Sequence, residues 1–347
     1  METVVPIIET VVLVITRAVM QGTPLLFGST GEILTEKSGN LNLGIPGIMY
    51  VGAISGVIGG FAYQSSVTTV NSFLAIFIPL VSCLVGSLLA SLIYAFITIT
   101  LRANQNVTGL ALTTFGVGLG NFFGGSLIKI TNSSTPYLSL SKISIVYRKT
   151  LPFVNDLKGL GDKLGLFGRI IGWLGEIVFS YGFMVYLAIV IAVVVSFILK
   201  RTRVGLQLRA VGESPATADA AGVNVEKYKY FATCAGGMIA GLGGLYYIMD
   251  KSMGIWANDA FGDRGWLAIA IVIFAIWRPN WSILGSYIFG GLYILFNYVS
   301  VSVNLLPLMQ MLPYVVTIIV LVIVSMRKKR ENQPPDSLGL NYFREER

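Results

Sequence analysis

The sequence contains no histidine and only two cysteines among its 347 residues. Without histidine, a zinc site built on imidazole, a histidine-activated nucleophile and a histidine proton relay are all excluded. Cys83 and Cys234 both fall inside long apolar runs, so neither a disulfide nor a cysteine-based metal site is indicated. We therefore predict no catalytic residue and no metal site in this chain.

Charge is also scarce. Charged residues make up 12% of the chain and hydrophobic residues 54%, with a mean hydropathy of +0.73. Soluble domains carry about a quarter charged residues, whereas apolar runs of about 20 residues, which recur here, are long enough to cross a bilayer. The sequence thus predicts an all-α, polytopic integral membrane protein. A soluble protein is disfavoured by nearly charge-free runs such as 177–199.

The apolar runs predict about nine transmembrane helices. The count extends from eight to ten, because residues 1–45 have room for a broken or re-entrant segment. Residues 1–330 are expected to form one transmembrane domain, and residues 331–347 a cytoplasmic C-terminal tail. The predicted spans are 8–32, 43–63, 74–101, 105–129, 177–199, 229–250, 264–278, 281–302 and 308–326.

The net charge of +8 would suggest a nucleic-acid partner in a soluble chain, but its distribution indicates a membrane topology instead. With nine spans, the basic residues between helices fall on one side, which the positive-inside rule makes cytoplasmic. The N-terminus is then outside and the C-terminus inside. The residues concerned are Lys37, Arg102, Lys200, Arg201, Arg203, Arg209, Lys227, Lys229, Arg278 and the run 327–330.

The connection 130–176 is the one sizeable region expected on the outer face. Its basic residues oppose the charge rule, which weakens in long connections. Within it, Leu157–Trp173 interleaves leucine, isoleucine and tryptophan with lysine and arginine. This pattern favours an amphipathic helix at the outer headgroups, and is also compatible with a rim on which a substrate-binding protein docks.

The loop 200–228 on the opposite face contains a short helix signal. Glu213 and Ser214 lead into Pro215, which suits a first helical turn, and Gly222 is placed to end the helix. The alanines between them favour helix without adding bulk. Such a helix cannot bury a core of its own, so it is expected to contact a partner through Glu213, Ser214, Pro215, Ala216, Ala218, Asp219 and Gly222.

Two motifs resemble one family. "RAVGESPATADAAGVNV" at 209–225 resembles the cytoplasmic coupling loop of ABC-transporter permeases of the branched-chain amino-acid and simple-sugar importer type. Thr23-Pro24-Leu25-Leu26-Phe27, followed by "GEILTEKSGNLNLGIPG" at 31–47, is similar to the nucleoside and simple-sugar branch of that family. The resemblance covers roughly residues 10–330. One departure is Pro46, where the family usually carries an acidic residue.

The resemblance implies a bacterial plasma-membrane importer for a nucleoside or simple sugar. It also implies ATPase subunits that grip the 213–222 helix, a second and often different permease subunit, and an extracellular substrate-binding lipoprotein or periplasmic protein. ATP and Mg²⁺ would bind to the ATPase, because this chain lacks the Gly-x-x-x-x-Gly-Lys-Ser/Thr motif. No cofactor is expected on the chain itself. ATP-driven motion of the helix would switch the bundle between two packings.

Polar residues in or beside spans are the candidates for a substrate pathway, since they are costly in lipid and usually face protein or water. A neutral lining of amides and hydroxyls would suit an uncharged sugar or nucleoside. Hydrogen bonds between helices are the alternative role for each of them. The candidates are Asn40, Asn42, Asn106, Thr108, Thr113 and Asn121.

Paired glycines also have two possible roles, close helix packing or the lining of a pathway. Gly116 and Gly120 stand four residues apart, as do Gly237 and Gly241, and this spacing lets helices approach closely. The same helices could instead line a pathway.

Three alternative functions stay open at this stage. A secondary transporter would favour ion-coordinating groups on unwound midplane helices, and the predicted spans hold few carboxylates. A permease for branched-chain amino acids is a second alternative. A membrane-embedded enzyme is disfavoured, because neither a Ser-Lys nor a paired-Asp arrangement is evident.

Overall fold

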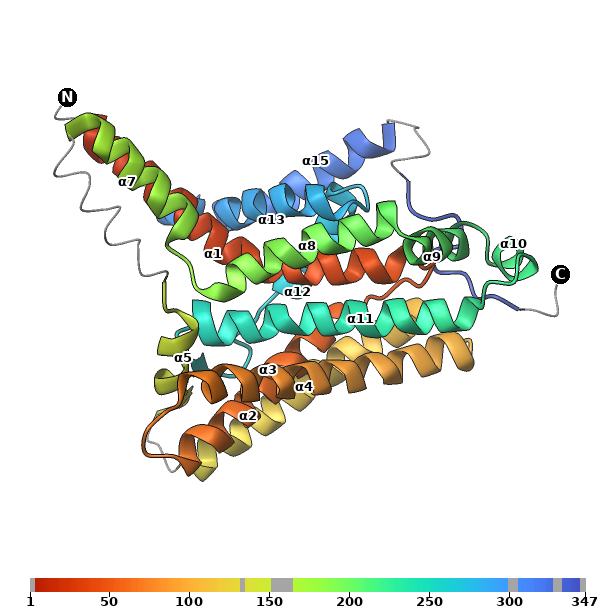
Figure 1. The fold of residues 1–347 in the computed structure, drawn as a ribbon, viewed down its shortest axis with the longest axis horizontal. Coiled ribbons are helices and arrows are strands. Elements are labelled where there is room, and N and C mark those ends of the chain that lie inside the picture. Colours follow the sequence, from red (N-terminus) through yellow and green to blue (C-terminus); the bar gives the residue numbers. More distant parts are fainter. Residues whose placement is uncertain (1–3, 132–134, 151–164, 299–304, 327–332, 344–347) are drawn as a thin grey trace.

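The computed structural model of the chain is a bundle of long helices that lie roughly side by side (Figure 1). It describes residues 4–131, 135–150, 165–298, 305–326 and 333–343. Within these ranges, six helices are long and apolar enough to cross a membrane: Ile8–Glu36, Ile45–Ser66, Ser72–Thr100, Gln105–Ile130, Phe183–Arg201 and Val225–Lys251. The prediction of a multi-pass, helical membrane protein is therefore confirmed.

The order of the helices and strands along the chain is as follows. The first half of the chain gives α1 (Val4–Glu36), α2 (Ile45–Ser66), α3 (Ser72–Ala95, continued by a π turn at Phe96–Thr100), α4 (Gln105–Ile130), β1 (Leu138–Ser139), α5 (Ser141–Tyr147) and α7 (Gly165–Phe179). The second half gives α8 (Phe183–Arg201), α9 (Arg203–Glu213), α10 (Pro215–Ala220), α11 (Val225–Tyr246, continued by a π turn at Tyr247–Lys251), β2 (Ile255–Trp256), α12 (Arg264–Phe274), α13 (Pro279–Ile294, continued by a 3-10 turn at Leu295–Asn297), α14 (Leu306–Gln310) and α15 (Leu312–Met326). The two strands form an antiparallel ladder in which Leu138 lies opposite Trp256.

The last three predicted spans are shorter than expected, so nine full-length spans are not confirmed. They correspond to α12, α13 and α15, with 11, 16 and 15 residues. At about 1.5 Å per residue, α12 reaches only about 16 Å, roughly half of a bilayer core. Helix α12 ends at Phe274 because a tight turn follows it. In this turn Ile276 and Trp277 both have positive φ, and the chain reverses into α13.

The inner half of α1 forms the centre of the bundle. Every residue from 22 to 36 is buried, and α1 contacts α8, α11, α12 and α13. Backbones come very close here: a Cβ on Gly31 would lie 2.2 Å from the Gly236 carbonyl oxygen of α11, and one on Gly22 would lie 2.3 Å from that of Ser286 in α13. These contacts exist only because glycine has no side chain.

A second glycine seam joins α2 to α4. A Cβ on Gly116 would lie 2.5 Å from the Gly47 carbonyl oxygen, and one on Gly120 would lie 2.6 Å from the Tyr50 ring. On α11, added Cβ atoms on Gly237 and Gly241 would meet serines of α3. The close-packing interpretation of these four glycines is therefore confirmed.

An amphipathic helix is present in the connection 130–176, but later than predicted. The observed helix, α7, spans Gly165–Phe179, contacts α1, and exposes Ile170, Leu174 and Val178. The first part of the predicted segment, 157–164, lies outside the described residues, as does the basic run 327–330.

The glycine seam makes a testable prediction about stability. Gly116→Ala should lower the free energy of unfolding of the detergent-solubilised chain by roughly 1–3 kcal/mol, because the new methyl group would overlap the Gly47 backbone. Gly118→Ala is the matched control two residues away, since a Cβ there meets nothing within 4 Å. Thermal unfolding of both variants decides the point. Equal melting temperatures would contradict the α2–α4 packing described here.

Candidate functional site

The short helix predicted in the 200–228 loop is present as α10. Ser214 caps it, with its Oγ accepting a hydrogen bond from the Thr217 backbone N–H at 3.4 Å, and Pro215 occupies the first turn. Gly222 has φ +84°, and the Val223 N–H donates to the Ala218 carbonyl at 3.0 Å, which closes the C-terminal end. Figure 1 places α10 at the tip of the bundle, and we refer to this as the α10 end.

The outward face of α10 differs from the predicted one. Ala218, expected to contact a partner, is only 4% exposed and packs on Val211 and Val225 of its own chain. The expectation that Ala218 contacts a partner therefore needs correction. Its small side chain allows close packing, and in the structure that packing is against residues of its own chain. The exposed residues of the helix and its end are Ala216, Thr217, Ala220, Ala221 and Gly222, with Glu213 exposed just before it and Ser214, Pro215 and Asp219 half-buried.

The segment 333–343, predicted as part of a tail, packs across the α10 end. The Ser337 N–H donates to the Gly212 carbonyl at 3.1 Å, and the Gly339 N–H to that of Gly39 at 3.3 Å. The Asn341 amide donates to the Arg102 carbonyl at 2.6 Å, and the Tyr342 hydroxyl to the Asp219 carboxylate at 2.8 Å. This segment, which we name the C-terminal strap, thus links the α9–α10 hairpin to the connections that follow α1 and α3.

Asn40 and Asn42 lie in the α1–α2 connection, and both are fully buried. The Asn40 amide donates to Thr233 Oγ1 at 3.0 Å, whereas Asn42 Oδ1 accepts from the Gly44 N–H at 2.9 Å. The Asn42 backbone N–H in turn donates to Glu32 Oε1 at 3.1 Å. The Asn40 side chain thus bonds across to α11, whereas the Asn42 side chain bonds within the connection. The pathway role of both residues stays a prediction.

A buried carboxylate pair near these amides was missed by sequence reasoning. Glu32 and Glu36 stand one turn apart on α1 and are 0% and 3% exposed. Trp277 Nε1, from the tight turn before α13, donates to Glu36 Oε2. The two glutamates stand four residues apart in the 31–47 motif, at the end of a predicted span, and this spacing could have indicated that they lie on one face of a helix.

The remaining pathway candidates lie on α4. Thr113 is buried and its hydroxyl donates to the Leu43 carbonyl at 2.8 Å, and that of half-buried Thr108 donates to the Asn104 carbonyl at 2.8 Å. Asn106 is exposed in the first turn. Asn121 exchanges two hydrogen bonds with Asp259, from its amide to Oδ1 at 2.8 Å and from the Asp259 N–H to its Oδ1 at 3.1 Å.

The loop 257–263, which follows β2, was not singled out from the sequence. It folds back against α4 and α2, and leads into α12 at Arg264. The Arg264 guanidinium lies 4.6 Å from the Tyr247 ring centroid and 4.9 Å from that of Tyr293. Three charges within 259–264, between apolar segments, were the signal that could have marked this loop.

The face of α4 that points away from α2 is exposed. Thr114 and Gly118 are exposed on this face and Asn121 is half-buried, and the three follow helical spacing. The apolar residues Phe115 and Phe122 flank them at 57% and 68% exposure. The carboxylates of Asp259 and Asp263 are exposed on the adjacent loop. This stripe offers hydrogen-bonding groups at membrane depth beside an apolar border.

Comparison with known families decides the class of protein. The profile of the family described as branched-chain amino acid transport system, permease component, matches residues 14–324. The chain belongs to this family. The resemblance drawn from 209–225 and 31–47 is confirmed, and the permease is a multi-pass transporter component.

Several relatives support the same assignment. The permease is 35% identical over 272 residues to a protein of Haloferax volcanii provisionally named a glucose ABC transporter permease, covering 78% of this chain and 73% of the other. It is 29% identical to a nucleoside ABC transporter permease of Lactococcus lactis, covering 97% and 99% of the two chains. A guanosine ABC transporter permease of Bacillus subtilis is also 29% identical, with 91% and 92% covered. No solved structure was found to match the permease.

The Asn121–Asp259 pair can be tested by a double-mutant cycle. Asn121→Ala and Asp259→Ala should each destabilise the permease, and the double variant should lose less than the sum. The difference should be about 1 kcal/mol, because the bond from the Asn121 amide to Asp259 Oδ1 is lost in either single variant. The bond from the Asp259 backbone N–H is lost only with Asn121→Ala. Thermal unfolding in detergent measures it. Strict additivity would mean that the loop is not fastened to α4 at this point.

Proposed function

We propose that this permease is the membrane subunit of an ATP-binding-cassette importer that moves a nucleoside or a simple sugar into the cell. The observation that carries the proposal is α10, a capped short helix that projects from one end of the bundle and exposes Ala216, Thr217 and Ala220. ATP would be hydrolysed on a separate subunit, because the sequence has no phosphate-binding loop.

The orientation follows from charge. Lys37, Lys200, Arg209 and Arg278 gather at the α10 end, and Arg102 lies there beside the C-terminal strap. The positive-inside rule makes this end cytoplasmic. The described part of the strap, and with it the C-terminus, is then on the cytoplasmic side, within reach of an ATPase.

The proposed coupling runs through the strap. A push on α10 reaches Asp219 and, through Tyr342 and Asn341, the α3–α4 connection at Arg102. The same segment bonds Gly39 in the α1–α2 connection. Motion of the ATPase would therefore act on several helix ends together, as a rigid-body switch requires.

The substrate class is inferred from the relatives and from α4. Relatives are named for nucleoside, guanosine and glucose transport. The stripe on α4 and the adjacent loop offer donors and acceptors that suit a polyhydroxylated solute, from exposed Thr114, Asp259 and Asp263 and from half-buried Asn121. A second permease subunit against this face of α4 would place the stripe between two chains. An extracellular binding protein would deliver the substrate to the opposite end from α10.

Substrate class can be tested by uptake in cells that lack this permease. Cells that regain it should accumulate a radiolabelled nucleoside or glucose, and leucine should not compete even in large excess. Restored leucine uptake without nucleoside or sugar uptake would overturn the proposed class in favour of a branched-chain amino-acid permease.

Coupling can be tested on the exposed face of α10. Ala220→Arg should insert and fold normally, yet reduce co-purification of the ATPase by about tenfold, because a long charged side chain is forced into a close contact. The matched control is Ala62→Arg, the same change at an exposed position of α2, at the end remote from α10. Undiminished ATPase recovery with Ala220→Arg would exclude α10 as the docking element.

A further inference from the structure

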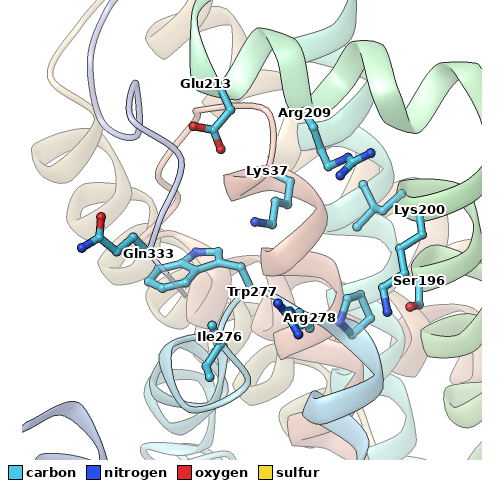
Figure 2. A pocket seen from close by; sticks show the side chains of 11 residues that line it. Lys37, Ser196, Lys200, Arg209, Glu213, Ile276, Trp277, Arg278 and Gln333 are labelled. Carbon is cyan, nitrogen blue, oxygen red and sulfur yellow. The ribbon is translucent and has the colours of Figure 1, made fainter. Parts of the chain in front are cut away.

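A polar cavity of about 530 Å³ lies at the α10 end, beside the coupling hairpin. It is lined by the residue after α1, the last turns of α8, α9, the turn between α12 and α13, and Gln333 of the C-terminal strap. Figure 2 shows Lys37 in its centre, with Arg209 and Glu213 above and Arg278 below. With Lys200, the lining holds four cationic side chains and one carboxylate.

One of these cations, Lys37, is partly desolvated. Burial lowers the pKa of the Lys37 ammonium, the Glu213 carboxylate opposes this effect, and Arg209 adds to it by repulsion. A cation that is removed from water and set among other cations is stabilised by a bound anion. The cavity has room for a group as large as a phosphodiester headgroup.

The turn at the cavity rim adds a second anion-favouring element. Ile276 and Trp277 adopt φ of 53° and 51°, a left-handed conformation that is unfavourable for residues other than glycine. The bond from Trp277 to Glu36 holds the turn in place. The result is that Arg278 and Pro279, at the start of α13, line the cavity, so the positive end of this 16-residue helix lies there.

Apolar surface adjoins the cavity on the two helices that meet there. On α8, Val193 and Phe197 are 50% and 61% exposed in the turns just before Lys200. On α13, Trp281 and Leu284 are 53% and 50% exposed just after Pro279. Val193, Phe197 and Lys200 follow helical spacing on α8, so the exposed apolar face of that helix leads to the cavity, and α8 contacts α13.

We propose that this cavity binds the phosphate of an anionic phospholipid, with the acyl chains lying along the exposed faces of α8 and α13. Charge in the headgroup region and apolar surface one to two turns away match the two parts of a lipid, whereas a soluble anion would use only the first. The assignment of this lipid to the cytoplasmic leaflet rests on the orientation proposed above, whereas the proposal that the cavity binds a lipid does not depend on that orientation.

The position of the cavity gives the lipid a regulatory role. Arg209 and Glu213 belong to α9, which leads directly into α10 through Ser214. A phosphate held by Arg209, Lys37 and Lys200 would fix α9 against α1 and α8. We expect an anionic lipid to raise the melting temperature of the permease.

The test uses the purified transporter, stripped of lipid and then supplied with phosphatidylglycerol or phosphatidylcholine. Native mass spectrometry should show phosphatidylglycerol retained by the wild type, with phosphatidylcholine bound much more weakly. Affinity should fall about fivefold for each cation removed in Lys37→Gln, Lys200→Gln and Arg209→Gln. Arg201→Gln is the matched control, because Arg201 neighbours Lys200 on α8 and does not line the cavity.

Several results would overturn the proposal. One is equal retention of the two lipids, and another is an equal loss with Arg201→Gln. Full displacement of phosphatidylglycerol by millimolar inorganic phosphate would indicate a soluble anion in place of a lipid. Unchanged lipid retention in the three variants, with loss of ATPase co-purification, would assign the cations to a protein contact instead. Lys200 is exposed, so Lys200→Gln should fold even if Lys37→Gln does not. The Lys200 variant alone then tests the proposal.

Discussion

The structure depends above all on the burial of the inner half of α1. Residues 22–36 have no exposed face, so every neighbouring helix must approach α1 at the distance that this stretch allows. Glycine sets that distance against α11 and α13. Two carboxylates lie in the same stretch, and unpaired charges there would cost several kcal/mol each. Glu32 is bonded by the Asn42 backbone and Glu36 by Trp277, so the α1–α2 connection and the turn before α13 are fastened to the central helix.

These attachments bring separate parts of the permease to one end. The turn fastened through Trp277 lines the cationic cavity, and the α1–α2 connection accepts a bond from the C-terminal strap. The strap also meets α10 through Tyr342. Consequently, the helix proposed to receive the force of ATP hydrolysis is bonded to the same frame that holds α1. A bundle packed through backbone contacts transmits such a displacement, because it deforms little.

Much of this was predictable from sequence where local chemistry decides the outcome. Ser214, Pro215 and Gly222 define α10 through a cap, a first-turn proline and a left-handed end, and all three act within a few residues. Hydropathy predicted the long spans for the same reason. It also predicted the break between 264–278 and 281–302, but placed the end of the first span too late, because Ala275, Ile276 and Trp277 are as apolar as the helix before them.

The candidate site was less predictable, because its contacts join distant residues. Ala218 faces Val211 and Val225 of its own chain, and Asn42 caps Gly44 within the chain. From the sequence alone, Ala218 was expected to contact a partner and Asn42 to contact the substrate. The strap and the Asn121–Asp259 pair link positions more than 100 residues apart, and no local pattern signals such a pairing.

The most direct test of the account is the energy source of transport in proteoliposomes that contain the permease, its partner permease and the ATPase. We predict that guanosine or glucose delivered by the binding protein accumulates only when ATP is present on the ATPase side, and that collapsing proton and sodium gradients leaves the initial rate unchanged. Accumulation driven by an ion gradient, without the ATPase or ATP, would contradict the assignment and identify a secondary transporter.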